Sequence, residues 1–311
     1  MTDRVVQLKL FISYLAGYLV AFLLRPRGMM NLRNFRLWER VGIHITPVHF
    51  YQPIPDTRAI PATPSTASAL VGIDMRPDFQ KRLVTEIFPQ YRDEYERIPL
   101  SAADPDEFVL DNPSFNGLDP FIFYCMLRWV NPSTMIEVGS GNSTLLAGTA
   151  IGRMSKAVDY VCIDPYAQPR IRNAVPNLEL IQSRVENVDL KVFERLKTGD
   201  ILFIDTSHTV RTGGDVCFLF LEVLPRLPAG VYVHVHDIFL PNDYPRHWIR
   251  ELRLFWNENY LLHAYLTNNR TVEVLAGSHY LANHFPTEVA VAFPRALKAD
   301  QSSFWFRTVG A

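Results

Sequence analysis

The sequence has 311 residues, of which 48% are hydrophobic and 20% are charged, and its formal net charge at pH 7 is −1. This composition excludes bulk disorder and suits a globular enzyme with one large domain or two smaller ones. A net charge near zero gives no overall attraction to nucleic acid, so we expect no nucleic-acid partner. Cys125, Cys162 and Cys217 lie far apart and form no CxxC motif. We therefore expect reduced thiols in a cytoplasmic protein and no zinc site.

The N-terminal end is both basic and apolar. Residues 1–40 carry seven Arg and Lys residues against Asp3 and Glu39. The apolar run Phe11–Leu24 is shorter than the about 20 residues that a bilayer span needs, and no small-residue cleavage site follows it. We expect residues 1–45 to form an apolar helix and then a basic amphipathic helix, with residues 1–40 in peripheral contact with the inner face of a membrane. A true span, a buried helix and a homo-oligomer interface stay open as alternatives.

Between residues 46 and 130 the sequence changes from proline-rich to helical. Prolines recur from Thr46 to Pro64, and each removes a backbone donor and biases the preceding residue away from helix. We expect an extended strap over the catalytic domain, with the aromatic residues 49–51 near its pocket. The apolar spacing of residues 78–98 and 118–130 predicts helices there.

From Thr134 onward, short apolar strands alternate with helices, which predicts a mostly parallel sheet with helices on both faces. The expected helices are Ser143–Ile151, Thr209–Leu224 and one near Arg246–Tyr265. The expected strands are Met135–Val138, Tyr160–Ile163, Leu178–Gln182, Ile201–Asp205, Val231–His236, Thr271–Leu275 and Phe304–Thr308.

The segment IEVGSGNST, from Ile136 to Thr144, follows a strand and opens a helix. Its two glycines let a ligand approach the backbone closely, and donors at a helix N-terminus suit an anionic carboxylate. Glu137, at the strand end, can meet a cationic amine. A methionine moiety carries both groups, so the loop favours S-adenosylmethionine. The candidate cofactor-binding residues are Glu137, Gly139, Ser140, Gly141, Asn142, Ser143 and Asp164.

Asp164 is included because it ends the next strand, twenty-three residues after Gly141. An acidic side chain at that point can accept hydrogen bonds from both ribose hydroxyls. The alternative is a solvent-facing aspartate that opens a turn before Pro165. The glycine loop upstream favours the cofactor role.

Four strand-end motifs, EVGSGNST, CIDPY, FIDTSH and HVHDI, occur in this order. Together they resemble the bacterial class I methyltransferases that include macrolide-sugar O-methyltransferases and cephamycin-biosynthesis methyltransferase-like proteins, over roughly residues 110–276. The resemblance implies a Rossmann-like α/β fold with a mostly parallel seven-stranded sheet and helices on both faces. The expected organisation is a helical segment over residues 1–45, a proline-rich strap and helix over 46–109, and a methyltransferase domain over 110–311.

In the resembling sugar methyltransferases, the aspartate of an Asp-x-x-His motif binds a divalent metal and the histidine is the base. Asp205, His208 and Asp237 match that pattern. His236 stands where an acid is usual, and a histidine ligand would favour Mn²⁺ over Mg²⁺ or leave the site empty. Alternatively, Asp205 caps the following helix, His208 is a surface histidine without a catalytic role, and His236 only orients Asp237.

Beyond the last motif, Asp243 and Tyr244 are the candidate substrate-contacting residues. Polar and aromatic side chains together suit a sugar or a phenolic ring. The helical spacing of Trp248, Leu252 and Phe255 instead predicts a packed helix face.

The leading hypothesis for function is O-methylation of a hydroxyl on a sugar, a glycan or a glycosylated small molecule, with His208 and Asp205 as catalytic residues. The alternative within the fold is a nicotinamide-dependent oxidoreductase. Glu137 would repel its pyrophosphate, and Thr144 replaces the third glycine of the dinucleotide fingerprint. A non-catalytic binding protein on a methyltransferase fold is a third hypothesis. The presence of Asp164 and His208 with the other motif residues argues against it.

Overall fold

The computed structural model describes residues 3–24, 32–61, 67–102 and 104–310. The chain divides into two compact units, Met1–Pro61 and Ala62–Ala311. This division lies between the two boundaries that we expected at residues 45 and 109.

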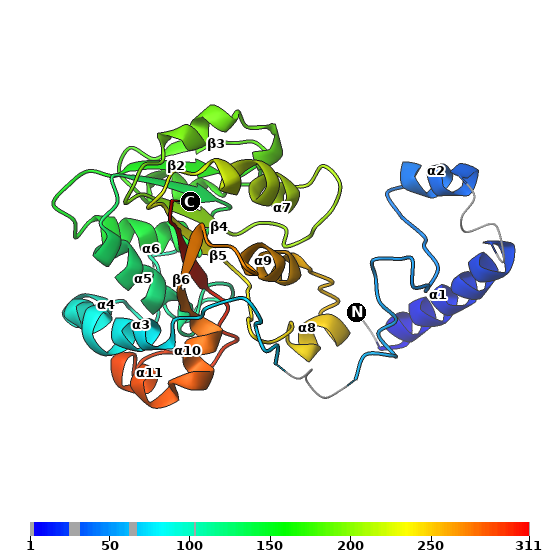
Figure 1. The fold of residues 1–311 in the computed structure, drawn as a ribbon. Coiled ribbons are helices and arrows are strands. Elements are labelled where there is room, and N and C mark those ends of the chain that lie inside the picture. The colour runs from blue at the N-terminus through cyan, green and yellow to red at the C-terminus, as the bar shows by residue number, and fades with distance from the viewer. Residues whose placement is uncertain (1–2, 25–31, 62–66, 103, 311) are drawn as a thin grey trace. The chain divides into compact units, whose positions relative to one another are not determined.

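The described residues of the first unit form two helices, α1 (Asp3–Leu24) and α2 (Leu32–Arg40), as expected from the sequence. Figure 1 shows both helices, in blue. The helix α1 begins at Asp3 rather than Phe11, so it has 22 residues. Residues 43–61 form neither helix nor strand, as the prolines predict, and residues 62–64 of the expected strap lie outside the described residues.

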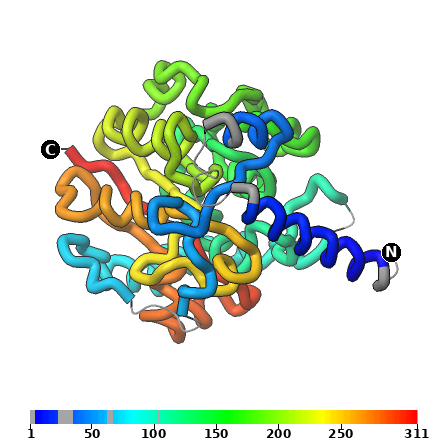
Figure 2. The backbone as a smooth tube through the Cα atoms, turned by 90° about the vertical axis from the view of Figure 1, so that its right-hand side faces the viewer, coloured from blue at the N-terminus to red at the C-terminus, as the bar shows by residue number. Residues whose placement is uncertain are grey.

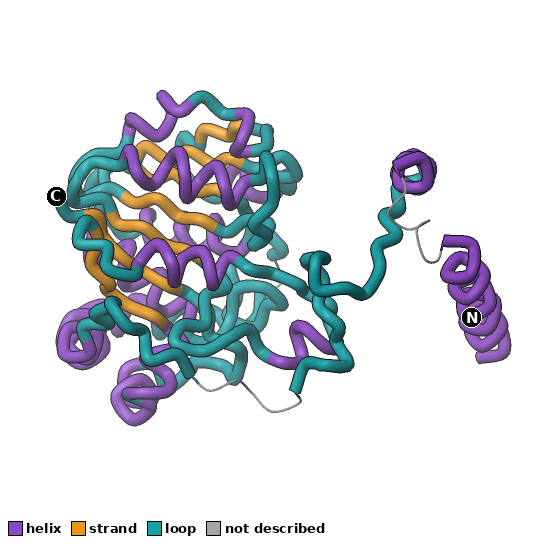
Figure 3. Tube along the Cα trace, turned by 45° about the vertical axis from the view of Figure 1, so that its right-hand side comes forward, coloured by secondary structure: helices purple, strands orange, loops and turns teal. Residues whose placement is uncertain are grey.

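The second unit is built on a seven-stranded sheet with the order β3-β2-β1-β4-β5-β7-β6. The strand β7 runs antiparallel to both of its neighbours, and the pairs among β1 to β5 are parallel. This confirms the predicted Rossmann-like fold with a mostly parallel seven-stranded sheet. Figure 3 shows the strands as one sheet between helices. The strands are β1 (Thr134–Val138), β2 (Asp159–Ile163), β3 (Glu179–Ile181), β4 (Ile201–Ile204), β5 (Tyr232–Val235), β6 (Val272–Gly277) and β7 (Phe304–Thr308).

Both faces of the sheet are buried, which explains why its strands read as continuous apolar runs. Successive residues of β1 point to opposite faces, so Met135 joins one hydrophobic cluster and Ile136 joins another. The first cluster includes α5 (Asp119–Val130) and α6 (Asn142–Ile151). The second includes α7 (Asp215–Phe218) and α9 (Glu258–Leu266).

The expected helix over residues 78–98 forms with changes of helical pitch. Its core residues, including Leu83 and Phe88, pack in the same cluster as α5. This segment therefore belongs to the second unit. Its parts are α3 (Pro77–Arg82), a π-helix (Leu83–Ile87), a 3-10 helix (Phe88–Tyr91) and α4 (Arg92–Tyr95).

Two other helix predictions were wrong in their bounds. The helix expected from Thr209 begins at Asp215 and ends in a π-helix (Leu219–Val223) and a 3-10 helix (Leu224–Arg226). The single helix expected near Arg246–Tyr265 is instead α8 (Arg246–Arg250) and α9, with irregular backbone between them. The sequence did not predict α10 (Ser278–His284) and α11 (Pro286–Ala292). Shorter 3-10 helices span Pro169–Asn173, Val185–Asn187 and Leu190–Arg195.

Candidate active site

The turn after β1 leaves no room for a side chain at its first glycine. Gly139 has φ +86°, in the left-handed region, and a Cβ atom there would lie 1.9 Å from the backbone oxygen of Asp205. The two loops meet because β1 and β4 are neighbours, with Val138 opposite Ile204. Residue 139 must therefore be glycine. Gly141 differs, because a Cβ atom there would meet nothing within 4 Å.

Glu137 lies beneath this loop and is 0% exposed. Its carboxylate accepts hydrogen bonds from Ser143 Oγ at 2.6 Å, Thr144 Oγ1 at 2.7 Å and Tyr160 OH at 2.7 Å. Burial raises the pKa of Glu137 to about 7, although the three hydroxyls oppose that rise. We expected Glu137 to contact the cofactor amine directly, and the structure corrects this prediction. The buried carboxylate instead holds the loop against the sheet through its three hydrogen bonds.

A cavity of about 540 Å³ opens at the carboxyl ends of β1, β2 and β4. Small-molecule sites typically measure about 300–1,000 Å³, and open α/β sheets bind ligands at the strand ends where the strand order reverses. That point here is the β1–β4 pair. Gly139, Ser140 and Asp164, all predicted to bind the cofactor, line the cavity. Residues that the sequence did not single out also line it: Pro165, Tyr166, Arg184, Glu186, Ser207, Arg211 and Asp215.

Asp164 is held in place by its neighbours. Its carboxylate accepts from Ser140 Oγ at 2.5 Å and from the backbone N–H of Tyr166 at 2.7 Å. Each carboxylate oxygen has a further lone pair. Asp164 can therefore accept hydrogen bonds from a ligand in the cavity without giving up these contacts.

Asn142 and Ser143 stabilise the loop and do not line this cavity. Asn142 Nδ2 donates to Asn112 Oδ1 at 2.8 Å and lies 2.9 Å from Ser114 Oγ, while the Ser143 hydroxyl is used by Glu137. We predicted that both side chains contact the cofactor, but the structure directs them to other residues of the protein. Their backbone N–H groups, at the start of α6, remain candidates for a carboxylate.

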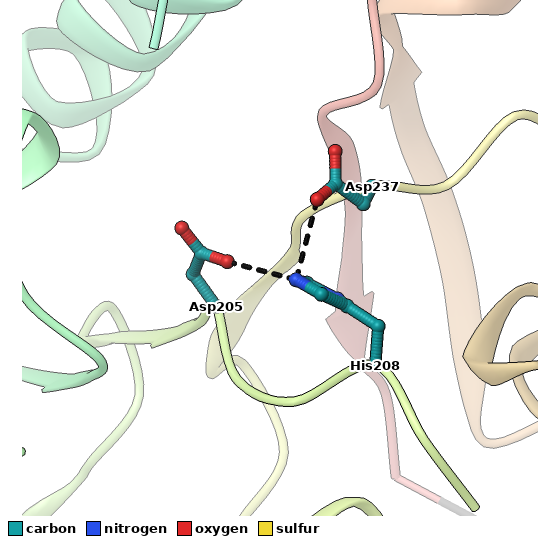
Figure 4. Close-up of side chains that lie close together, drawn as sticks. All are labelled: Asp205, His208 and Asp237. Atoms are coloured by element: carbon teal, nitrogen blue, oxygen red, sulfur yellow. Dashed lines mark ion pairs between the residues drawn. The ribbon is translucent and has the colours of Figure 1, made fainter. Parts of the chain in front are cut away.

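Asp205, which follows β4, and Asp237, which follows β5, point at the same nitrogen of His208 (Figure 4). His208 Nε2 lies 3.2 Å from Asp205 Oδ1 and 3.2 Å from Asp237 Oδ2. Because β4 and β5 are adjacent parallel strands, their carboxyl ends bring the two loops together. The structure thus brings together three of the predicted site residues.

Glu258 completes this group, and sequence reasoning missed it. Its Oε2 lies 2.8 Å from His208 Nδ1, and its side chain is 0% exposed. The backbone N–H groups of Asn257 and Glu258 both donate to the carbonyl of His208, and the ring of Trp256 lies 4.4 Å from the imidazole. We call Asp205, His208, Asp237 and Glu258 the His208 cluster.

The electrostatics of the cluster favour a protonated imidazole. Burial alone would lower the pKa of His208, but Asp205, Glu258 and Asp237 outweigh it and raise this pKa well above 6.5. His208 and Asp237 also have φ values of +55° and +57°. Such left-handed backbone is uncommon outside glycine and is concentrated at functional sites.

His236 is near Asp237 but does not belong to the candidate metal-binding group, contrary to our expectation. Among the described residues, the donor atoms that lie within 4.8 Å of one another and could hold a metal are those of Asp205, His208 and Asp237. His236 Nε2 is 3.8 Å from Asp237 Oδ1, and its ring lies on the same face of β5 as that of His234, 5.5 Å away. The cause is geometric. His236 continues β5, since its N–H donates to the carbonyl of Ile204, whereas His208 lies on the loop that follows β4.

A second cavity, of about 450 Å³, adjoins the cluster on the side of Asp237. Asp243 and Tyr244, the predicted substrate residues, line a different cavity. Tyr244 is 3% exposed, and its hydroxyl accepts from the backbone N–H of Asn259 at 3.0 Å, which gives its ring a packing role. The second cavity is lined by Pro113, Ser114, Asn116, Asp119, His236, Asp237, Trp248, Leu252, Leu254, Trp256, Ala299, Asp300 and Ser302.

Residues 136–238 match the family model described as a methyltransferase domain. An uncharacterized protein of Archaeoglobus fulgidus is 27% identical over 201 residues, which cover 60% of this chain and 90% of that protein.

Solved structures of methyltransferases also resemble the chain, at low sequence identity. A Podospora anserina methyltransferase bound to SAH has 14% identity and a TM-score of 0.39, covering 76% of this chain and 94% of that one. An O-methyltransferase from Bacillus cereus in complex with SAH has 12% identity and a TM-score of 0.36, covering 73% and 90%. Residues 136–238 are thus similar to a methyltransferase domain, and they lie in the parallel part of a Rossmann-like sheet.

Proposed function

We propose that this protein transfers a methyl group from S-adenosylmethionine to a hydroxyl of a sugar, a glycan or a glycosylated small molecule. One observation carries the proposal. Asp205 lines the first cavity, Asp237 lines the second, and His208 Nε2 lies 3.2 Å from both carboxylates. The cluster therefore lies where a cofactor in one cavity would meet an acceptor in the other.

The first cavity suits the cofactor. Asp164 offers carboxylate oxygens to ribose hydroxyls, and Gly139 gives the ligand access to backbone. The start of α6 offers N–H groups to the carboxylate of the methionine moiety. Tyr166 is exposed at the cavity wall, where its ring could cover the adenine.

The reaction requires a group that accepts a proton. The methyl group moves from the sulfonium to the acceptor oxygen, the carbon–sulfur bond breaks to leave S-adenosylhomocysteine, and the hydroxyl proton leaves. We assign that proton to Nε2 of neutral His208, which Glu258 orients through Nδ1. Because the carboxylates raise the pKa of His208, its neutral form is favoured at alkaline pH. The transfer rate is expected to increase as pH rises through the raised pKa of His208.

The same donors could hold the divalent cation that the family resemblance implies. Two carboxylates and an imidazole suit Mn²⁺ better than Mg²⁺, and a carboxylate on the far ring nitrogen, as Glu258 provides, is common behind histidine ligands. A cation there would lower the pKa of a bound hydroxyl. His208 would then be a ligand, and its loss would abolish metal dependence together with activity.

The second cavity suits a neutral or cationic hydroxylated acceptor. Its described lining contains three carboxylates, those of Asp119, Asp237 and Asp300, against the single imidazole of His236, and no Lys or Arg. The rings of Trp248 and Trp256 are 5.3 Å apart at 88°, and such rings pack against the apolar face of a sugar. An acceptor carrying a carboxylate or phosphate would be repelled.

The test is transfer of a labelled methyl group from S-adenosylmethionine into cell extracts, followed by separation of glycans and glycosylated small molecules. We expect alkali-stable label in the carbohydrate fraction with wild type, little with His208→Ala, and normal label with the control His284→Ala, which changes an exposed histidine. Label confined to protein or nucleic acid would contradict the acceptor class. The absence of transfer, with binding of a reduced nicotinamide, would favour the oxidoreductase.

A further inference from the structure

The helix α1 has no polar face. Leu10, Phe11 and Ile12 follow one another and so point about 100° apart around the axis, yet they are 60%, 59% and 56% exposed. Figure 2 shows α1 as one uninterrupted helix. Within it, Val5–Phe22 is long and apolar enough to cross a membrane, and 0% of that window is buried. A helix that is apolar all round is normally buried in a core or in a membrane.

We propose that α1 is a membrane-spanning anchor. This revises the interfacial helix expected from sequence, which requires a polar face that α1 lacks. Its 22 residues span about 33 Å at the helical rise, against a hydrocarbon core of about 30 Å. Lys9 lies near the N-terminal end, where its long stem can reach the interface.

A lipid bilayer fits α1 better than a second copy of the chain. Pairing of two helices covers one side of each and leaves the other sides in water, whereas lipid covers every side. Leu10 and Leu19 lie nine residues apart and therefore on opposite sides of the axis, and both are exposed. A partner helix could cover only one of them. The bilayer therefore accounts for the whole exposed surface of α1.

The segment after α1 suits the surface of an anionic membrane. The sequence from residue 25 to residue 40 carries five arginines against Glu39, of which Arg25 and Arg27 lie outside the described residues. In α2, Arg36 and Arg40 share one side of the helix, while Phe35 and Trp38 share another. Five arginines follow α1, whereas Arg4 and Lys9 lie toward its other end, and the end of a span with more Lys and Arg is normally cytoplasmic. This orientation places the second unit in the cytoplasm.

Full-length protein in isolated membranes tests this anchor. We expect it to stay in the pellet through high salt and alkaline carbonate and to leave it only in detergent. Leu15→Arg combined with Leu19→Arg should shift the distribution toward the supernatant by about tenfold or more, because arginine at the centre of a span is costly. The matched control combines Leu221→Arg with Val291→Arg, which change exposed apolar residues of the second unit, and it should stay in the membrane.

The melting curve of the second unit should be the same in wild type and in the Leu15/Leu19 variant, which separates release from unfolding. Protease added outside spheroplasts should leave the second unit intact. Soluble wild type, or release by salt or carbonate, would overturn the proposal. The proposal would also be overturned if the recovered protein lacked α1, as after cleavage of a signal peptide. It would be overturned as well if the protease added outside the spheroplasts digested the second unit.

Discussion

Glu137→Gln tests whether a buried, protonatable carboxyl fastens the cofactor loop. Burial raises the pKa of Glu137 from 4.5 to about 7. The folded protein therefore holds a proton that the unfolded chain releases between these two pH values. Because the folded state binds more protons there, the contribution of Glu137 to stability is largest below pH 4.5 and decreases as pH rises to 7.

The size of the effect follows from the two pKa values. One pH unit corresponds to about 1.4 kcal/mol, so the change from 4.5 to about 7 amounts to roughly 3 kcal/mol of unfolding free energy. Glutamine has no such titration, but its single oxygen cannot serve all three hydroxyls of Ser143, Thr144 and Tyr160. The variant should therefore be less stable than wild type at pH 5, and the difference should narrow toward pH 8.

Urea unfolding of both proteins at several pH values between 5 and 8 measures this difference. The control is Glu107→Gln, which changes an exposed glutamate and should give the same pH profile as wild type. A stability difference for Glu137→Gln that stays constant or widens with rising pH would refute the reasoning.

Three further substitutions test the site. His208→Ala should retain binding of S-adenosylhomocysteine by calorimetry and lower the methyl-transfer rate by about 10²–10⁴-fold; near-normal turnover at neutral pH would remove His208 from the mechanism. Glu258→Gln should lower the methyl-transfer rate by about 10–100-fold. It should also move the rising limb of the pH–rate profile to lower pH, because one carboxylate that raises the pKa of His208 is lost. A rising limb at the same pH as in wild type would contradict the positioning role of Glu258. Gly139→Ala should lower the unfolding free energy by about 3 kcal/mol or more and abolish cofactor binding, since its Cβ would lie 1.9 Å from the Asp205 oxygen; a normal melting temperature would contradict the close approach.

The fold could be predicted because its signals are local. Each strand of the parallel part is a short apolar run that is followed by a polar residue. Because both faces of the sheet are buried, this apolar run can be recognised in the sequence before the packing partners of the strand are known. Asp205 and Asp237 could be placed together because neighbouring strands end at the same edge. The carboxylates of Asp164 and Asp205 line the first cavity for the same reason.

The rest of the site depends on contacts between distant segments. Glu258 lies fifty residues from His208, and the apolar spacing around it predicted a continuous helix. The irregular backbone between α8 and α9 is what brings Trp256 and Glu258 to the imidazole. Glu137 likewise ends up facing the hydroxyls of α6 and β2, because the strand alternation that sets its direction depends on the packing of both sheet faces.

The central claim, that the cavity at the ends of β1, β2 and β4 binds S-adenosylmethionine, is tested most directly by titrating the full-length protein with S-adenosylhomocysteine in a calorimeter. We predict saturable binding of one molecule per chain. Asp164→Ala should weaken this binding by about tenfold or more, as expected for loss of a hydrogen-bonded carboxylate, and reduced nicotinamide dinucleotide should give no binding. Absence of binding by S-adenosylhomocysteine, or unchanged affinity in Asp164→Ala, would contradict the account.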